Sequence, residues 1–284
     1  MTQIAFIGGG NMATSIIGGL IREDAVSPDL IHVSDPGAEQ RERLTRDFGI
    51  VTHESNLDAI SSATVVILAV KPQMMKAVLE PLQATLNTRQ PLLISVAAGI
   101  SLPTLKEWSG CTAVVRAMPN TPALTGFGAT GLFASEEVSL DQRNLTDTLL
   151  GATGLAMWVQ TEAEIDAVTA LSGSGPAYYF LLMESMIDAG IKLGLSEETT
   201  QRGVARCPEE TSTSVSEQRV KIVGYQDKPR IIYASVCSVI ITGGVTVGQG
   251  TFGVVQQCIH SKETHPLLNV NHLSNCCGIL FIYG

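Results

Sequence analysis

The first residues in the chain that suggest a chemistry form a glycine turn between an apolar run and an apolar-periodic segment. The run is residues 3–7 (QIAFI), and the segment after the turn carries isoleucine and leucine at helical spacing. Such a strand–turn–helix unit binds the pyrophosphate of a dinucleotide, because the helix N-terminus presents free N–H groups and a positive dipole end. The residues of the turn that we expect to contact the cofactor are Gly8, Gly9, Gly10, Asn11, Met12 and Ala13.

Three positions of this turn have separate tasks. Gly8 permits the tight turn, Gly10 lets the backbone approach the pyrophosphate without an intervening Cβ, and Ala13 takes the packing position. The alternative is an ordinary turn between a strand and a helix. The N-terminal strand and the helix that follows are the context that the cofactor hypothesis requires, so we favour it.

The elements that must position this turn alternate between strand-like and helix-like segments up to about residue 125. The continuous apolar run at residues 63–70 is typical of a buried parallel strand. Residues 31–34, 92–96 and 113–118 are further strand-like segments, and residues 41–48 indicate a helix. This alternation predicts an α/β fold with a doubly wound sheet, in which ligands lie beyond the carboxyl ends of the strands.

The character of the chain changes twice after this part. From about 135 to 203 the spacing predicts helices at residues 140–150, 162–171 and 177–193, with a glycine-serine turn before the last of these. The last helix is mostly apolar, which is typical of a helix buried against other helices or against a partner subunit. From about residue 204 the character of the chain changes again: residues 230–259 show no helical periodicity, and this last part contains five of the six cysteines.

Five stretches together resemble the pyrroline-5-carboxylate reductase family over roughly residues 1–203. They are AFIGGGNMA (5–13), LAVKPQ (68–73), ISVAAG (94–99), RAMPNTP (116–122) and ALSGSGPAYY (170–179). The resemblance implies a Rossmann-like dinucleotide-binding domain at 1–125 and the start of a helical substrate and dimerisation domain at 126–203. Residues 204–284 form an atypical tail in place of the expected helical bundle.

The resemblance also implies a reaction and its site. The family reduces 1-pyrroline-5-carboxylate to L-proline by hydride transfer from NAD(P)H, in the last step of proline biosynthesis. Cofactor contacts carried over by position, besides the glycine turn, are Ser34, Asn56, Ala69, Val70, Lys71, Pro72, Ser95, Val96 and Ala97. Met118, Pro119 and Asn120 are expected near the nicotinamide.

The chemistry of imine reduction is compatible with these residues. Solvent can protonate the imine nitrogen, so the protein must supply orientation and a dry site, and we assign no residue as certainly catalytic. The substrate carboxylate needs an anion pocket, and Ser172, Gly173, Ser174 and Gly175 offer backbone N–H groups and hydroxyls before a helix. A glycine-serine turn that only caps this helix is the alternative. With Met118 and Asn120, these four residues are our expected substrate-binding set.

The choice between NADPH and NADH depends on the end of the second strand. Ser34 can accommodate a 2′-phosphate, whereas Asp35 can bond a ribose hydroxyl and repel that phosphate. Arg41 and Arg43 either offset the repulsion between Asp35 and a 2′-phosphate or are solvated charges on a helix. The family favours NADPH, which we adopt with NADH as the alternative.

Composition limits the classes of partner. The chain has 284 residues and a net charge of −9, which argues against a nucleic-acid or anionic-membrane surface. Its apolar runs are too short to span a bilayer, and the N-terminus lacks the features of a signal peptide, so we expect a cytoplasmic enzyme. The resemblance implies a homodimer or a ring of dimers.

The sequence departs from the family near its end. The family carries a serine-proline-glycine-glycine-threonine-threonine loop about sixty residues after SGSGPA, by resemblance to the family, and here only Thr242–Thr246 (TGGVT) is similar. A metal site in the tail is disfavoured, because its ligand spacing is irregular; the candidate ligands are Cys258, His260, His265, His272, Cys276 and Cys277. We therefore expect no metal.

Two other functions remain open at this point. One is a beta-hydroxyacid-type dehydrogenase on the same two-domain plan, for which Lys192 is the candidate base. The other is a dinucleotide-binding protein without turnover, because the altered C-terminal part leaves the site incomplete.

Overall fold

The computed structural model describes residues 2–206. The chain divides into two compact units, one extending to Pro176 and the other beginning at Ala177. The first unit contains the sheet and its covering helices. The described part of the second unit consists of most of one long helix and a further helical segment at residues 197–206.

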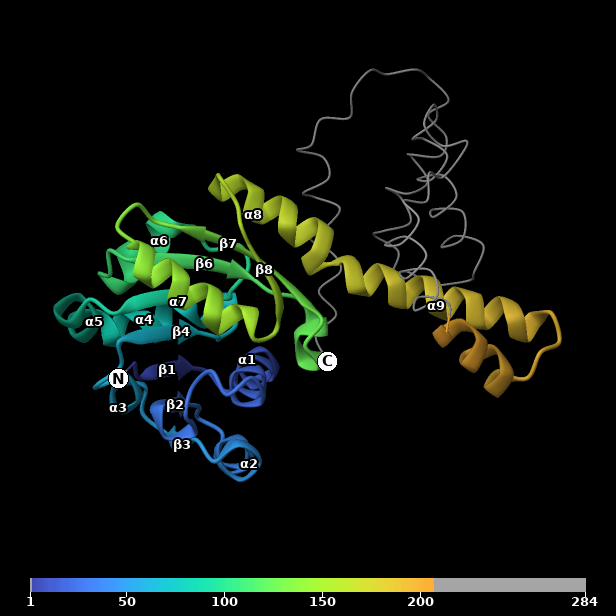
Figure 1. Cartoon of the computed structure of the whole chain (residues 1–284), viewed down its shortest axis with the longest axis horizontal. Helices are drawn as coiled ribbons and strands as arrows, with labels where there is room; N and C mark the ends of the chain where they lie inside the picture. Colours follow the sequence, from blue (N-terminus) through green and yellow to red (C-terminus); the bar gives the residue numbers. More distant parts are fainter. Residues whose placement is uncertain (1, 207–284) are drawn as a thin grey trace, which may run out of the picture. The chain divides into compact units, whose positions relative to one another are not determined.

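An eight-stranded sheet forms the centre of the first unit (Figure 1). The strand order is β3-β2-β1-β4-β5-β6-β7-β8, and every neighbouring pair is parallel except β6 and β7. The strands are β1 (Ile4–Ile7), β2 (Ile31–Ser34), β3 (Val51–His53), β4 (Val65–Leu68), β5 (Leu92–Ser95), β6 (Val114–Met118), β7 (Gly128–Ala134) and β8 (Gly154–Trp158).

Helices connect the strands and cover both faces of the sheet. They are α1 (Asn11–Arg22), α2 (Ala38–Phe48), α3 (Asn56–Ile60), α4 (Met75–Leu79), α5 (Gln83–Arg89), α6 (Leu102–Ser109), α7 (Leu140–Gly151), α8 (Glu162–Val168) and α9 (Gly175–Lys192). One-turn 3₁₀ helices lie at Pro28–Leu30, Pro72–Met74, Glu80–Leu82 and Thr121–Thr125, and a π-helical turn lies at Thr169–Gly173.

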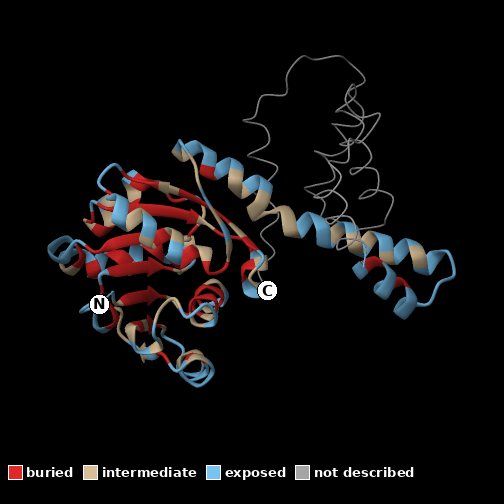
Figure 2. Cartoon of the chain, viewed as in Figure 1, coloured by how far each residue is buried: buried red, intermediate tan, exposed pale blue. Residues whose placement is uncertain are grey.

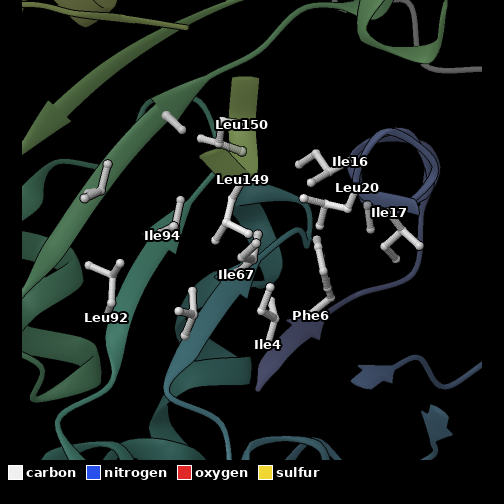
Figure 3. Packing of buried hydrophobic residues seen from close by; sticks show 14 of the residues in the cluster. Ile4, Phe6, Ile16, Ile17, Leu20, Ile67, Leu92, Ile94, Leu149 and Leu150 are labelled. Atoms are coloured by element: carbon white, nitrogen blue, oxygen red, sulfur yellow. The ribbon is translucent and has the colours of Figure 1, made fainter. Parts of the chain in front are cut away.

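Alternation along the strands separates two apolar clusters, one on each face of the sheet. In β1, Ile4 and Phe6 enter the cluster that α1 and α7 cover, whereas Ala5 and Ile7 enter the opposite cluster. Figure 2 shows the strands as a buried layer between exposed helix faces. In Figure 3, side chains of α1 and α7 point towards those of β1, β4 and β5. Such two-sided burial explains why the central strands β1 and β4 are continuous apolar runs.

The predicted fold class is confirmed, since the sheet is mainly parallel and doubly wound. The five expected strands are present, but sequence analysis missed β3, β7 and β8. Because β7 and β8 extend the same sheet, the first unit continues to Pro176, whereas we expected a boundary near residue 125.

None of the helices between residues 2 and 206 combines the length and the apolar character that a membrane span requires.

Candidate functional site

The glycine turn has the backbone geometry that its sequence predicts. Gly8 has a φ of 96°, and a Cβ at this position would lie 2.8 Å from the Ala69 carbonyl oxygen. A Cβ on Gly10 would meet nothing within 4 Å. Gly10 caps α1 without a side-chain hydrogen bond, and Ala13 is fully buried. The helix N-terminus therefore faces open space that an anion can approach closely.

Asp35 takes part in holding this turn. One oxygen of its carboxylate accepts the Gly9 N–H at 2.9 Å, and the other accepts the Gly37 N–H at 2.8 Å. The same carboxylate thus fixes both the glycine turn and the start of α2. From the sequence we expected Asp35 only as a ribose ligand, because a backbone partner as distant as Gly9 is not visible in a local motif.

Ser34 lies inside the sheet instead of in the groove. Its side chain is buried, and its hydroxyl donates a hydrogen bond to the Phe6 carbonyl at 3.3 Å. The structure therefore does not offer this hydroxyl to a 2′-phosphate, in contrast to the sequence-based expectation. The reason is that Ser34 is still part of β2, where its side chain is buried, while Asp35 follows at the strand end.

The two candidate cations after β2 differ in position. Arg41 donates from Nη1 to the carbonyls of Asp35 at 2.7 Å and Pro36 at 3.0 Å, so its guanidinium lies beside the turn. Arg43 instead pairs with Asp47 at 3.9 Å along the same helix. The structure brings Arg41 to the candidate ribose site and leaves Arg43 as a surface helix charge.

The remaining cofactor candidates also lie at strand ends. Ala69, Val70, Lys71 and Pro72 follow β4, while Ser95, Val96 and Ala97 end and follow β5. The Ser95 hydroxyl accepts the Ala97 N–H at 3.3 Å, which fixes the chain where it leaves the sheet. Asn56 is the first residue of α3, after β3. Because these strands are parallel, their carboxyl ends share one edge of the sheet.

The residues present fit a nicotinamide dinucleotide. A glycine with open space above it, an uncapped helix N-terminus and a guanidinium beside the turn after β2 are the features that pyrophosphate and ribose need. When bound, the nicotinamide supplies the hydride, while this chain supplies its orientation and the enclosure of the site.

An ion pair anchors α8 to the sheet. The Arg116 side chain, in β6, is only 6% exposed and donates from Nη1 to Glu162 Oε1 at 2.7 Å. The same Glu162 oxygen accepts the Leu102 N–H at 2.6 Å. Glu162 is the first residue of α8, so a buried cation fixes the start of the helix that leads to the glycine-serine stretch. The motif RAMPNTP contains this arginine, but its partner depends on the tertiary structure.

The glycine-serine stretch is not the turn that the sequence suggested. Thr169–Gly173 form a π-helical turn between α8 and α9, and the Ser174 N–H donates to the Thr169 carbonyl at 2.9 Å. The expectation of several free N–H groups at a helix start is therefore wrong for Ser174. The serine hydroxyls also bond local carbonyls, since Ser172 donates to Val168 and Ser174 to Thr169.

The structure nevertheless brings this stretch against the end of β6. A Cβ on Gly173 would lie 2.9 Å from Met118 Cε. Asn120 Nδ2 donates to the Ser172 carbonyl at 3.0 Å. The two segments that we expected to enclose the substrate, about fifty residues apart, are thus in direct contact.

Comparison with known proteins matches both parts of the chain. Residues 3–99 match the family model described as NADP oxidoreductase coenzyme F420-dependent, and residues 162–247 match that of pyrroline-5-carboxylate reductase dimerisation. The pyrroline-5-carboxylate reductase of Pseudomonas aeruginosa is 55% identical over 201 residues, which cover 70% of this chain and 73% of the relative. That of Haemophilus influenzae is 46% identical over 199 residues, covering 70% and 72%.

Solved structures give the same result. A pyrroline-5-carboxylate reductase from Coxiella burnetii has a TM-score of 0.73 and 34% identity, covering 85% of this chain and 97% of that one. The Plasmodium falciparum pyrroline carboxylate reductase, solved with NADP bound, has a TM-score of 0.71 and 25% identity, covering 85% and 95%.

Fold, glycine turn and family models together define an oxidoreductase that uses a nicotinamide dinucleotide. The chain belongs to the pyrroline-5-carboxylate reductase family, which confirms the resemblance seen in the sequence. Its activity is that of the family, the reduction of pyrroline-5-carboxylate, and neither the beta-hydroxyacid dehydrogenase nor the binding-only alternative is favoured. The dimerisation match also supports assembly into oligomers.

The dimerisation match continues to residue 247, past the position near 204 where we expected the departure from the family. The TGGVT fragment at 242–246 and the scattered cysteines and histidines of the tail lie outside the described residues.

Proposed function

We propose that this chain reduces 1-pyrroline-5-carboxylate to L-proline with NADPH as the preferred hydride donor. The observation that supports this proposal best is the contact between the end of β6 and the π-helical turn, beside a strand edge suited to a dinucleotide. The dinucleotide lies along the carboxyl ends of β1, β4 and β5. The substrate lies next to Met118 and the stretch Ser172–Gly175.

The proposed cofactor contacts are those of the strand edge, with one change. Ser34 acts through its backbone position alone, because its hydroxyl is committed to Phe6. The other contacts remain Gly8, Gly9, Gly10, Asn11, Met12, Ala13, Asn56, Ala69, Val70, Lys71, Pro72, Ser95, Val96 and Ala97. The hydroxyls of Ser172 and Ser174 contact the substrate by exchanging a local carbonyl for the ligand.

The direct test is oxidation of NADPH by the purified chain in the presence of 1-pyrroline-5-carboxylate, with NADH measured in parallel. Turnover with a higher kcat/KM for NADPH is the expected result. Dinucleotide binding without turnover would overturn the catalytic proposal and favour the binding-only alternative. A higher kcat/KM for NADH would overturn the cofactor preference alone.

The preference for NADPH follows from the position of Arg41. Its guanidinium is beside the turn after β2, where a 2′-phosphate is expected, and it is 18% exposed. The Asp35 carboxylate is held by two backbone N–H groups, which reduces its repulsion of a phosphate. The relative solved with NADP bound supports the same donor.

We expect Arg41→Ala to raise the KM for NADPH by about tenfold while changing the KM for NADH by less than about twofold, since only NADPH loses a charge-assisted hydrogen bond. Arg43→Ala is the matched control, because Arg43 pairs with Asp47 on the same helix. Equal effects of Arg41→Ala on both cofactors would contradict the assignment.

The active form is a homodimer or a ring of dimers, built through the region that matches the dimerisation model. The enzyme acts in the cytoplasm, as expected from the sequence.

A further inference from the structure

The carbonyl of Ser172 has lost its ordinary helical partner. In an α-helix each carbonyl accepts the N–H of the residue four positions later. For Ser172 that residue is Pro176, which has no N–H. The sequence of the glycine-serine stretch therefore rules out the α-helical hydrogen bond of the Ser172 carbonyl, at the junction of the π-helical turn and α9.

Asn120 supplies the missing donor. Its Nδ2 donates to the Ser172 carbonyl at 3.0 Å, and its Oδ1 accepts the Ala129 N–H at 2.9 Å, next to the first residue of β7. The residue is 8% exposed. Both ends of the amide are thus used inside the protein, and the side chain joins the π-helical turn to the sheet.

The neighbouring contacts leave the π-helical turn little freedom to move away from this amide. A Cβ on Gly131 in β7 would lie 2.8 Å from Val168 Cγ1, so the end of α8 packs closely on the sheet. A Cβ on Gly173 would likewise lie 2.9 Å from Met118 Cε, so the π-helical turn packs closely on the end of β6. The hydrogen bond from Asn120 adds a directional contact to this packing, and it orients the Ser172 carbonyl.

We infer that Asn120 is a positioning residue for the reduction, replacing the donor that Pro176 removes and thereby holding Ser172–Gly175 in register with Met118. This inference rests on the proposed placement of the substrate beside these residues. It assigns Asn120 an effect on the reaction through Ser172, in place of the direct substrate contact expected from the sequence.

The test combines a variant that removes the donor to the Ser172 carbonyl with one that adds a new donor. Asn120→Ala removes the donor, and Pro176→Ala in the same chain restores an N–H four residues after Ser172. We expect Asn120→Ala to lower kcat/KM for 1-pyrroline-5-carboxylate by about tenfold, while the dissociation constant of NADPH changes by less than about twofold. The double variant should recover kcat/KM to within about threefold of the unmodified chain. Pro176→Ala alone should have the same kcat/KM as the unmodified chain.

A matched control separates this rescue from a general effect of removing a proline. Pro103→Ala also adds an N–H, in the first turn of α6, where helical N–H groups have no intrahelical acceptor. Combined with Asn120→Ala, it should restore nothing. Asn120→Asp provides a second variant should Asn120→Ala fail to fold, because a carboxylate still accepts the Ala129 N–H but cannot donate to Ser172.

A measurement without substrate keeps the inference independent of the proposed reaction. Hydrogen–deuterium exchange of residues 165–176 in the ligand-free full chain should accelerate about tenfold in Asn120→Ala and Asn120→Asp, and return towards the original rate in the Asn120→Ala/Pro176→Ala variant. Absence of turnover in the unmodified chain would defeat the proposed function and leave this result unaffected.

Loss of kcat/KM and of exchange protection, both recovered by Pro176→Ala and not by Pro103→Ala, supports the inference. Loss of kcat/KM without recovery overturns it and makes Asn120 a direct ligand contact. Unchanged exchange in the Asn120 variants overturns it as well.

Discussion

Gly8 and Gly10 are the same residue type two positions apart, yet the structure constrains them in opposite ways. Gly8 has a positive φ and no room for a Cβ, because the Ala69 carbonyl lies too close. Gly10 has an ordinary φ of −69° and open space around it. Gly8 therefore maintains the fold of the turn, whereas the lack of a side chain at Gly10 matters only when a ligand approaches.

We expect Gly10→Ala to leave the thermal midpoint unchanged and to weaken dinucleotide binding by about tenfold, because its Cβ occupies the space that the pyrophosphate needs. Fluorescence titration with NADPH measures this change. Gly151→Ala is the control, since a Cβ there also meets nothing within 4 Å but lies at the end of α7. Unaltered binding in Gly10→Ala would show that the pyrophosphate does not bind at this turn.

At the scale of elements, polar side chains from elsewhere in the chain hold two segments in place. The π-helical turn depends on Asn120 from the segment after β6. The edge strand β3 is tied to β2 by a pair of stacked histidines, His32 and His53, whose ring nitrogens lie 2.9 Å apart. Gln3 Nε2 lies 2.7 Å from the other ring nitrogen of His32.

The histidine pair predicts a loss of stability in acid. Burial, and then the charge of His53, lower the pKa of His32 below its ordinary value of 6.5, while a hydrogen bond to the backbone of Asp29 opposes them. The unfolded chain therefore binds a proton that the folded chain does not, between the folded pKa and 6.5. The free energy of unfolding should decrease as the pH falls through this window.

Thermal midpoints of the full chain at pH 7.5 and at pH 5 test this expectation, with His32→Gln as the comparison. We expect the native chain to lose more stability between these conditions than the variant does, because glutamine has no proton to bind in this range. An identical pH dependence in both chains would contradict the role of His32.

At the scale of the whole molecule, helix α9 indicates why the chain assembles. None of the residues of α9 is buried in the described structure. The large apolar and aromatic side chains that it exposes include Tyr179, Phe180 and Leu182. This helix falls within the match to the dimerisation family. Exposed apolar side chains in such a region are typical of an interface between subunits.

Phe180, 59% exposed, is the side chain that we would change to test this interface. In a two-fold symmetric dimer Phe180→Asp removes two apolar contacts and adds two charges, so we expect the dissociation constant of the dimer to rise about a hundredfold or more. Sedimentation over a range of protein concentrations measures it. Leu140→Asp, at an exposed apolar position in α7, should leave assembly unchanged; equal effects would refute the specificity of α9.

The sequence by itself determined the parts of this protein that depend on local pattern. Strand-like segments predicted β1, β2, β4, β5 and β6, and the glycine turn predicted the start of α1, because each signal lies within a few residues. The motifs MPNTP and SGSGPAY identified the family. Strands β7 and β8 were missed, because glycines interrupt β7, and β8 is only half buried at the end of the sheet.

Only the tertiary structure decided how these parts meet. Asp35 bonds Gly9, Arg116 bonds Glu162 and Asn120 bonds Ser172, each tens of residues away in sequence, and nothing in the local pattern specifies these partners. The folded sheet also buried Ser34 and directed Arg41, but not Arg43, towards the turn after β2. Local sequence fixes which backbone shapes are available, whereas packing between distant elements selects the polar partners, because a buried donor or acceptor must find one wherever the fold provides it.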